Sequence, residues 1–345
     1  MSGLLGDKLV NKITISDVAK HAGVSKASVS YVLSGRKKLS DDVEERIFAA
    51  VEELGYQPPN HAPLLSKHAP KVINFCLPIE TGTLSDDPYY IPLIEGALDY
   101  ATTQGYHMMI TRLSQGDETA KRLFYRSLDF VDGVLLCNLQ RDHAFEQSLI
   151  DRNMPYVVNG TPDNVETKYY VDADIEGIAY QAATFLLKKG FRNIFYINLA
   201  EHLLQSQQRL SGFKLAHQDL DIPWDEGHHS FCNVSMDDSE ALMTAVLDRA
   251  PHFADAVVTS NEIQARGAIK ALQERQIAIP HQMAVVSMGG SSLAMIGHPK
   301  LTTIDFSPKK IGRETAKMLI EVIERKRIRP SHLIVPGKLM EREST

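Results

Sequence analysis

The sequence predicts an α/β fold in which a small N-terminal domain of three helices precedes a larger domain of two lobes built on parallel β-sheets. Two observations support this prediction. In about the first sixty residues, apolar residues recur at helical spacing and glycines end three short segments. From Val72 onward, short apolar runs alternate with helical stretches, which is typical of parallel sheets with helices on both faces. About 270 residues of this alternation are long for one sheet, so we expect two similar lobes.

The composition is that of an ordinary folded protein. Of the 345 residues, 43% are hydrophobic and 23% are charged, which excludes a disordered chain or a collagen-like repeat. No apolar run approaches the roughly 18 residues of a membrane-spanning helix, and the N-terminus lacks the features of a signal peptide. Three distant cysteines, Cys76, Cys137 and Cys232, form no disulfide pattern. We therefore expect a cytoplasmic protein without a membrane partner.

Charge is segregated along the chain. The net charge is −6, yet residues 8–40 hold seven lysines and arginines against one acid, Asp17. This segment carries a local charge of +6 and leaves −12 on the remainder. A basic segment on an acidic protein favours contact with nucleic acid. A solvated basic surface is the alternative.

Each of the three predicted helices begins at a hydroxyl cap and stops at a glycine. The cap and stop residues are Thr14 and Gly23, Ser25 and Gly35, and Ser40 and Gly55. Two short helices joined by a turn that contains glycine, with a third packed across them, are typical of a helix-turn-helix domain. The polar face of the second helix carries Lys26, Ala27, Ser30 and Tyr31, which would reach base edges in the major groove. A three-helix bundle used only for packing is the alternative.

The run ITISDVAKHAGVSKASVSYVLSG over residues 13–35, followed by LGYQP over residues 54–58, resembles the headpiece of the LacI/GalR family of bacterial transcriptional regulators. The resemblance implies base-reading positions at Lys26, Ala27 and Tyr31. It also implies phosphate contacts at Ser25, Ser28, Ser30 and Ser34. The family usually has arginine where this chain has Tyr31, and tyrosine cannot make the bidentate contact to guanine. We therefore expect an unusual operator half-site.

Residues 57–71 contain four prolines, which is typical of a linker between domains. The resemblance implies that this segment becomes a hinge helix on DNA and inserts a leucine into the minor groove. Leu65 takes that position here. Pro63 departs from the family pattern, because proline inside a helix costs roughly 3 kcal/mol. The hinge is expected to be distorted or to begin later than the family norm.

Eight apolar runs of the large domain are expected to be strands. They lie at residues 72–77, 106–111, 133–137, 156–159, 193–198, 256–260, 284–288 and 301–305. Helical patterns between them include residues 91–103, 176–188, 210–218, 240–249 and 264–276. Ligands of such folds bind beyond the carboxyl ends of the strands, which places a site in the cleft between the lobes.

The large domain resembles the same family, whose effector domain is similar to a type I periplasmic sugar-binding protein. The matching stretches are DPYYIPLIEG (residues 87–96), RLSGF (209–213), TSNE (259–262) and PKLTT (299–303). The implied domains are a helix-turn-helix domain at 12–57, a hinge linker at 58–71 and a two-lobed effector and dimerisation domain at 72–345. The N-lobe is expected at about 72–169 and 296–329, and the C-lobe at about 170–295 and 330–345.

The resemblance assigns ligand contacts to five residues: Tyr89, Tyr90, Asn159, Arg209 and Asn261. Core packing is the alternative for the two tyrosines. For Arg209, whose fixed donors suit hydroxyls or a carboxylate, the alternative is a salt bridge between lobes.

The effector site of this chain departs from the family pattern at two positions. Gly289 replaces a ligand-binding aspartate, and Val234 stands where an aromatic residue often stacks on the ligand. These losses predict a larger, charged or less hydroxylated effector than an ordinary sugar.

Enzyme motifs are missing from the sequence. It contains no Walker loop and no Gly-x-Gly-x-x-Gly. The adjacent His228 and His229 lack the spacing of two metal ligands on one helix. We expect no catalytic residues, no metal site and no cofactor.

These features predict a sequence-specific DNA-binding transcriptional regulator, a repressor whose operator affinity is set by an effector bound between the lobes. The effector is expected to be a sugar or a related metabolite. The expected partners are palindromic double-stranded operator DNA, the effector and a second copy of the chain, with a tetramer as the alternative. The competing classes are a small-molecule binding protein without a gene-regulatory role and an enzyme on an α/β scaffold.

Overall fold

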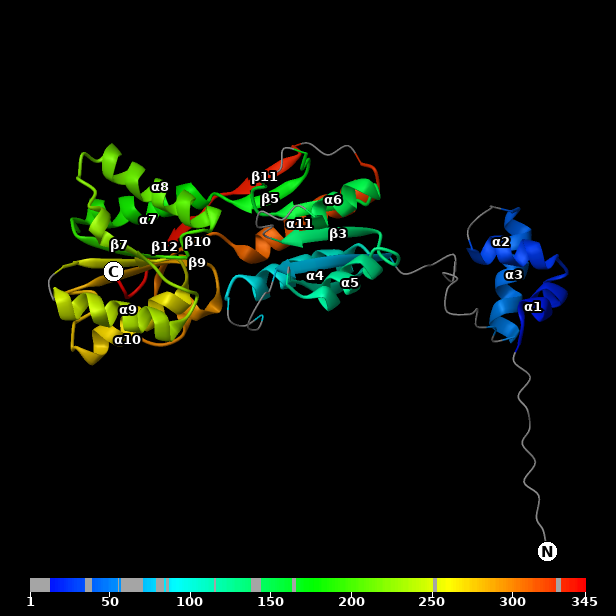
Figure 1. The fold of residues 1–345 in the computed structure, drawn as a ribbon, viewed down its shortest axis with the longest axis horizontal. Coiled ribbons are helices and arrows are strands. Elements are labelled where there is room, and N and C mark those ends of the chain that lie inside the picture. The colour runs from blue at the N-terminus through cyan, green and yellow to red at the C-terminus, as the bar shows by residue number, and fades with distance from the viewer. Residues whose placement is uncertain are drawn as a thin grey trace, which may run out of the picture. The chain divides into compact units, whose positions relative to one another are not determined.

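The computed structural model describes residues 13–34, 39–54, 56, 71–78, 84, 87–114, 116–137, 144–162, 166–250, 253–326 and 330–345, apart from the side chains of residues 34 and 52. The chain divides into two compact units, Met1–Lys71 and Val72–Thr345. Among the described residues, the first unit contains helices and the second contains two sheets covered by helices (Figure 1). The expected hinge, with Pro63 and Leu65, lies outside the described residues.

The three helices predicted for the first unit are confirmed: α1 (Ile15–Ala22), α2 (Lys26–Ser34) and α3 (Asp41–Leu54). The N–H of Thr14 donates to Asp17 Oδ2 at 2.8 Å, which fixes the start of α1. Gly23 ends that helix with a φ of 67°, a left-handed conformation that glycine adopts without strain. Val18, Val29 and Ile47, one from each helix, are fully buried and form the centre of the core.

The second unit contains two six-stranded sheets. The first has the order β11-β5-β4-β3-β1-β2, with β1 (Lys71–Pro78), β2 (Tyr106–Leu113), β3 (Gly133–Cys137), β4 (Tyr156–Asn159), β5 (Tyr170–Ala173) and β11 (His332–Val335). The second has the order β12-β10-β9-β8-β6-β7, with β6 (Ile194–Asn198), β7 (His229–Phe231), β8 (Ala256–Thr259), β9 (Ala284–Gly289), β10 (Thr302–Asp305) and β12 (Lys338–Met340). β12 pairs antiparallel with β10, while β10 pairs parallel with β9. Each of the eight predicted apolar runs overlaps a strand.

Helices cover both faces of each sheet (Figure 1). The first sheet is covered by α4 (Tyr90–Thr103) and α11 (Pro308–Ile323) on one face, and by α5 (Glu118–Ser127) and α6 (Ala144–Asp151) on the other. The second sheet is covered by α7 (Ile175–Lys189) and α8 (Leu204–Asp219) on one face, and by α9 (Met236–Arg249) and α10 (Glu262–Glu274) on the other. Two short 3₁₀ turns, η1 (Glu226–His228) and η2 (Ser292–Met295), complete the described elements. In the described part of the chain, no helix has the length and apolar character needed to cross a bilayer.

The chain crosses between the sheets after Ala173, Asp305 and Val335. These points lie later than the crossovers expected near residues 170, 295 and 330. The difference has a physical reason: β5 and β11 pair with each other in the first sheet, and β10 pairs with β9 in the second, before the chain leaves. The strands β5, β10 and β11 therefore each belong to the lobe opposite to the one that the sequence indicated.

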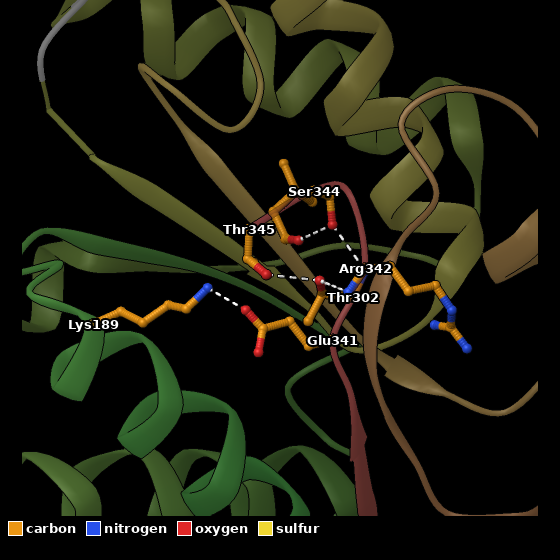
Figure 2. Close-up of polar contacts among 7 residues, drawn as sticks. Lys189, Thr302, Glu341, Arg342, Ser344 and Thr345 are labelled. Atoms are coloured by element: carbon orange, nitrogen blue, oxygen red, sulfur yellow. Dashed lines mark hydrogen bonds and ion pairs between the residues drawn. The ribbon is translucent and has the colours of Figure 1, made fainter.

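The last residues of the chain hold the second sheet together (Figure 2). Ser344 is fully buried, and its Oγ donates to the carbonyl oxygen of Val285 at 2.6 Å while accepting from the N–H of Thr302 at 2.8 Å. Glu341 forms an ion pair with Lys189 of α7 at 2.5 Å. The segment after β12 thus links the beginnings of β9 and β10 and is anchored to a covering helix.

Candidate functional site

The exposed face of α2 carries the residues expected to read DNA. Lys26, Ala27, Ser30 and Tyr31 are all exposed, and Tyr31 has 43% of its surface accessible. Val29, Val32 and Leu33 point the other way and are buried in the core of the first unit. Lys26 is the first residue of the helix and lies at the positive end of the helix dipole. No acid in the first turn offsets this positive charge.

Two of the expected phosphate-contacting serines shape the start of this helix. The Oγ of Ser25 accepts from the N–H of Ser28 at 3.0 Å and lies 2.8 Å from the Ser28 hydroxyl. This is the side-chain cap predicted for Ser25. Ser34 ends α2, but its side chain is outside the described part of the structure, as is Leu65.

The geometry of the turn before α2 is set by the third helix. Arg46 of α3 donates to the carbonyl oxygens of Ala22 at 2.5 Å and Gly23 at 3.2 Å. A Cβ at Gly23 would lie 3.0 Å from the Arg46 guanidinium. Glycine suits this turn because of its left-handed backbone conformation, and a side chain there would also displace the end of Arg46.

In the second unit, a pocket of about 170 Å³ lies between the lobes and is called the interlobe pocket below. It opens at the carboxyl ends of the strands, where parallel sheets usually bind ligands. Its walls include Pro78, Ala173, Leu199, Ser260, Gly290 and Phe306, which end or follow β1, β5, β6, β8, β9 and β10.

Aromatic residues form one wall of the interlobe pocket. The Tyr89 ring lies edge-on to Tyr90, with centroids 5.7 Å apart, and 6.0 Å from the ring of Phe306. Both tyrosines line the pocket and also pack against the core, which is the alternative role given to them. Burial raises the pKa of Tyr89 well above its ordinary value, which keeps the phenol a neutral donor.

Asn159 does not lie in the wall of the pocket. It is fully buried behind Tyr89, whose hydroxyl donates to Asn159 Oδ1 at 2.9 Å. The Asn159 amide in turn donates to the carbonyl oxygen of Val171 at 3.2 Å. The sequence prediction of a direct ligand contact is corrected here to a supporting position, because the asparagine sits one layer deeper than the tyrosine.

Arg209 on α8 carries donors that no described residue satisfies. The residue is 6% exposed, lines the pocket, and has no hydrogen-bond partner for Nε or Nη1 among the described atoms. Asp87 and Asp172, from the other lobe, line the same pocket. Burial raises the pKa of each carboxyl, and the positive charge of Arg209 opposes that shift. Among the described contacts Arg209 forms no ion pair with either, so the salt bridge considered as its alternative role is not made.

The acidic side of the pocket is held by short local bonds. Asp172 accepts from both the N–H and the hydroxyl of Thr161 at 2.7 Å. Asp87 accepts from the N–H of Tyr89 at 2.9 Å. Both carboxylates are therefore fixed in place beside the unsatisfied guanidinium of Arg209.

A buried amide organises the C-lobe wall. Gln264 of α10 is fully buried, and its Nε2 lies within 3.2 Å of the carbonyl oxygens of Asn198, Cys232 and Asn233. Its N–H donates to Asn261 Oδ1 at 2.9 Å, and Asn261 lines the pocket. Gln264 thereby ties together the loops that follow β6, β7 and β8.

A carboxylate from another residue lies in the space next to position 289. Glu262, 1% exposed, places its carboxylate where an ideal Cβ of Gly289 would be, 2.2 Å from Oε1. Its Oε1 accepts from the N–H groups of Gly290 and Ser291, both at 2.9 Å. Val234 lines the pocket without adding an aromatic face, as predicted. Position 289 itself carries no carboxylate, but the carboxylate of Glu262 lies beside it in the pocket wall.

Sequence reasoning missed several pocket residues: Asp87, Asp172, Gln205, Ser260, Glu262 and Phe306. Asp87, Ser260 and Glu262 stand inside or beside the quoted motifs, and Phe306 follows a predicted strand. Asp172 lies in β5, a strand that lacks an apolar run. The rule that ligands bind at carboxyl strand ends could have found most of them.

A metal centre is not seen in the described residues, where no three histidine, cysteine, aspartate or glutamate side chains gather. His228 instead stacks on Phe253, with ring centroids 4.1 Å apart. The adjacent His229 lies edge-on to Phe231 at 5.5 Å.

A helix-turn-helix unit on the same chain as a two-lobed unit with a polar pocket defines the class of ligand-responsive DNA-binding regulators. A family model described as bacterial regulatory proteins, lacI family, matches residues 14–59, and one for a periplasmic binding protein-like domain matches residues 183–345. The HTH-type transcriptional regulator CelR of Thermobifida fusca is 30% identical over 333 residues, covering 96% of this chain and 98% of that protein. The HTH-type transcriptional repressor PurR of Yersinia pestis is 30% identical over 337 residues, 96% of each chain.

Solved structures agree with these sequence matches. The transcriptional regulator CelR–cellobiose complex superposes with a TM-score of 0.72 at 29% identity, covering 96% of this chain and 100% of that one. The chain belongs to the lacI family of bacterial regulatory proteins, and it is a transcriptional regulator.

Proposed function

We propose that this regulator is a repressor whose affinity for a palindromic operator is set by an uncharged, polyhydroxylated effector in the interlobe pocket. In this proposal residues 12–57 bind DNA, residues 58–71 form the hinge, and residues 72–345 bind the effector and dimerise. Relatives across nearly the whole chain are transcriptional regulators, which supports a binding role without catalysis.

One observation carries the choice of effector: the unsatisfied Nε and Nη1 donors of Arg209 lie in a pocket with Asp87 and Asp172. A hydroxyl group can accept from the guanidinium and donate to a carboxylate at the same time. An anionic ligand would satisfy the arginine but would be repelled by the two acids. The rings of Tyr89 and Phe306 add an apolar surface, which suits the C–H faces of a sugar ring.

A relative supports the same ligand class. The complex that is 29% identical to this chain contains cellobiose. We therefore choose cellobiose as the first test ligand, with lactose and glucose for comparison. In a thermal-shift assay cellobiose should raise the melting temperature of the full chain, because a ligand that binds the folded state stabilises it by mass action. No shift with any of the three sugars would contradict the proposed ligand class.

DNA recognition is proposed for the exposed face of α2, with Lys26, Ala27 and Tyr31 at bases and Ser25, Ser28 and Ser30 at phosphates. Ser34 and Leu65 are proposed as further DNA contacts. Selection from a randomised DNA library should return a palindrome, and binding to it should weaken steeply with salt. Lys26→Ala should weaken binding to the selected operator and its variants alike, whereas Tyr31→Ala should change which variant is preferred. An equal loss on every variant would remove Tyr31 from base reading.

A further inference from the structure

At the end of β9 and the start of α10, the side chain of Glu262 fills the space next to Gly289 in the interlobe pocket. An ideal Cβ at Gly289 would lie 2.2 Å from Oε1 and 2.3 Å from Oε2 of Glu262. Contacts that short do not occur, so the side chain of Glu262 occupies the space that any larger residue at position 289 would need. Glutamate at 262 in this position therefore requires glycine at 289, although the two residues lie far apart in the sequence.

We propose that Glu262 is a specificity-determining residue of this pocket and that its carboxylate accepts a hydrogen bond from a hydroxyl of the bound effector. This inference rests on the proposed function, in which the effector is an uncharged polyol. It adds a second recognition point, on the C-lobe, to the one formed by Arg209, Asp87 and Asp172.

Three features of the geometry support this role. Glu262 lines the pocket beside Asn261 and Gly289. It is 1% exposed, and burial of an ionised carboxylate is costly unless donors surround it. The N–H groups of Gly290 and Ser291 both donate to Oε1 at 2.9 Å. Burial raises the pKa of this carboxyl, and the hydroxyl of Ser291 and the N–H of Glu262 itself are further donors that oppose this larger effect by lowering the pKa.

The alternative is that Glu262 only holds the turn at residues 290–291. Glutamine separates the two roles, because its amide oxygen has the same reach and can accept from the same two N–H groups. It cannot offer the charged acceptor that strengthens a hydrogen bond to a ligand hydroxyl. A purely structural role therefore predicts no loss of effector binding in Glu262→Gln.

The first arm measures cellobiose binding by calorimetry with the full chain. Glu262→Gln should weaken binding at least about tenfold, while operator binding without sugar stays within about twofold. Glu240→Gln is the matched control, because Glu240 pairs with Lys270 on the outer side of the neighbouring helices at 2.8 Å. This control should bind cellobiose as the wild type does. Wild-type affinity in Glu262→Gln would overturn the proposal.

The second arm places a carboxylate on β9 in place of the one on Glu262. Glu262→Ser should lose effector binding, and the double variant Glu262→Ser/Gly289→Asp should recover most of it, because an aspartate at 289 then fills the vacated space. A folded double variant that binds no better than Glu262→Ser would overturn the proposal.

The third arm needs no ligand and separates this inference from the proposed function. Gly289→Ala should lower the melting temperature of the wild type by more than it lowers that of Glu262→Ser, because the collision requires the glutamate. Suppose that the wild type binds none of the sugars but Gly289→Ala still lowers its melting temperature more than that of Glu262→Ser. The proposed effector class would then be contradicted, whereas the placement of the Glu262 carboxylate beside position 289 would be supported. Equal effects of Gly289→Ala in both backgrounds would overturn that placement.

Discussion

At the scale of single residues, Arg209 is the least satisfied buried group of the pocket. A buried guanidinium without acceptors is costly to the folded state, so its presence implies a gain elsewhere. The carboxylates of Asp87 and Asp172 are held by their own local bonds and do not pair with it. The unsatisfied donors are therefore available to a ligand that enters the pocket.

Replacing Arg209 by methionine should separate stability from effector response. Without sugar, Arg209→Met should melt near the wild-type temperature, because the substitution removes two unsatisfied buried donors but also takes from Asp87 and Asp172 the positive charge that lowers their pKa. It should lose the shift caused by cellobiose and keep its operator affinity. Lys214→Met on the same helix is the control, since Lys214 is on the surface beside Glu226 at 2.5 Å. Loss of sugar-free DNA binding in Arg209→Met would make the arginine structural.

His217 is expected to make stability depend on pH. Burial lowers its pKa from the ordinary 6.5, and Nδ1 lies 3.1 Å from the carbonyl oxygen of Pro223. As the pH falls, the unfolded chain therefore takes up a proton at this residue before the folded state does. Stability from this group is present above pH 6.5 and is lost below it.

The check is a comparison of melting temperatures at about pH 7 and about pH 5 for the wild type and His217→Asn. Asparagine keeps a donor near the Nδ1 position but does not titrate. The wild type should lose more stability on acidification than the variant does. Parallel curves for the two proteins would show that His217 does not contribute. Using the difference between two proteins cancels the shared titration of Asp87, Asp172 and Glu262.

At the scale of elements, two glycines allow α4 and α11 to pack closely. A Cβ at Gly96 would lie 1.8 Å from the carbonyl oxygen of Lys309, and one at Gly312 would lie 1.9 Å from that of Leu93. The contacts are reciprocal, so neither helix can accept a side chain at the crossing. This crossing supports the pocket, because α4 carries Tyr90 and α11 begins at Pro308, both of which line it.

Alanine at Gly312 should therefore destabilise the large unit by about 1–3 kcal/mol, since the backbone of α4 must move away. Gly116→Ala is the control: its added Cβ would meet no atom within 4 Å. Chemical denaturation of the two variants measures the difference. Equal stability would mean that the helices separate without cost.

At the scale of the whole molecule, the proposed second copy of the chain follows from the proposed operator. One helix-turn-helix unit contacts few bases, and a palindromic site matches a two-fold axis. The chain should therefore sediment as a dimer at micromolar concentration, with a tetramer as the alternative. A monomer that retains full operator binding would contradict this prediction.

The sequence by itself determined the elements whose signals are local. Helical spacing and caps such as Thr14 with Asp17 predicted all three helices of the first unit, because capping and periodicity act within a few residues. Central strands were also predicted, since strands buried on both faces are continuous apolar runs. Arg209, singled out through the family resemblance, lines the interlobe pocket.

Only the tertiary structure decided features that depend on residues far apart in the chain. The strands β7, β11 and β12 escaped prediction because they lie at sheet edges, where one side is exposed and no apolar run is needed. β5 escaped it because Asp172 interrupts its four residues. Asn159 lies behind Tyr89, and the carboxylate beside Gly289 belongs to Glu262. Each of these features depends on which side chain occupies a space that two elements share. That is decided by packing between elements and not by neighbours in the sequence.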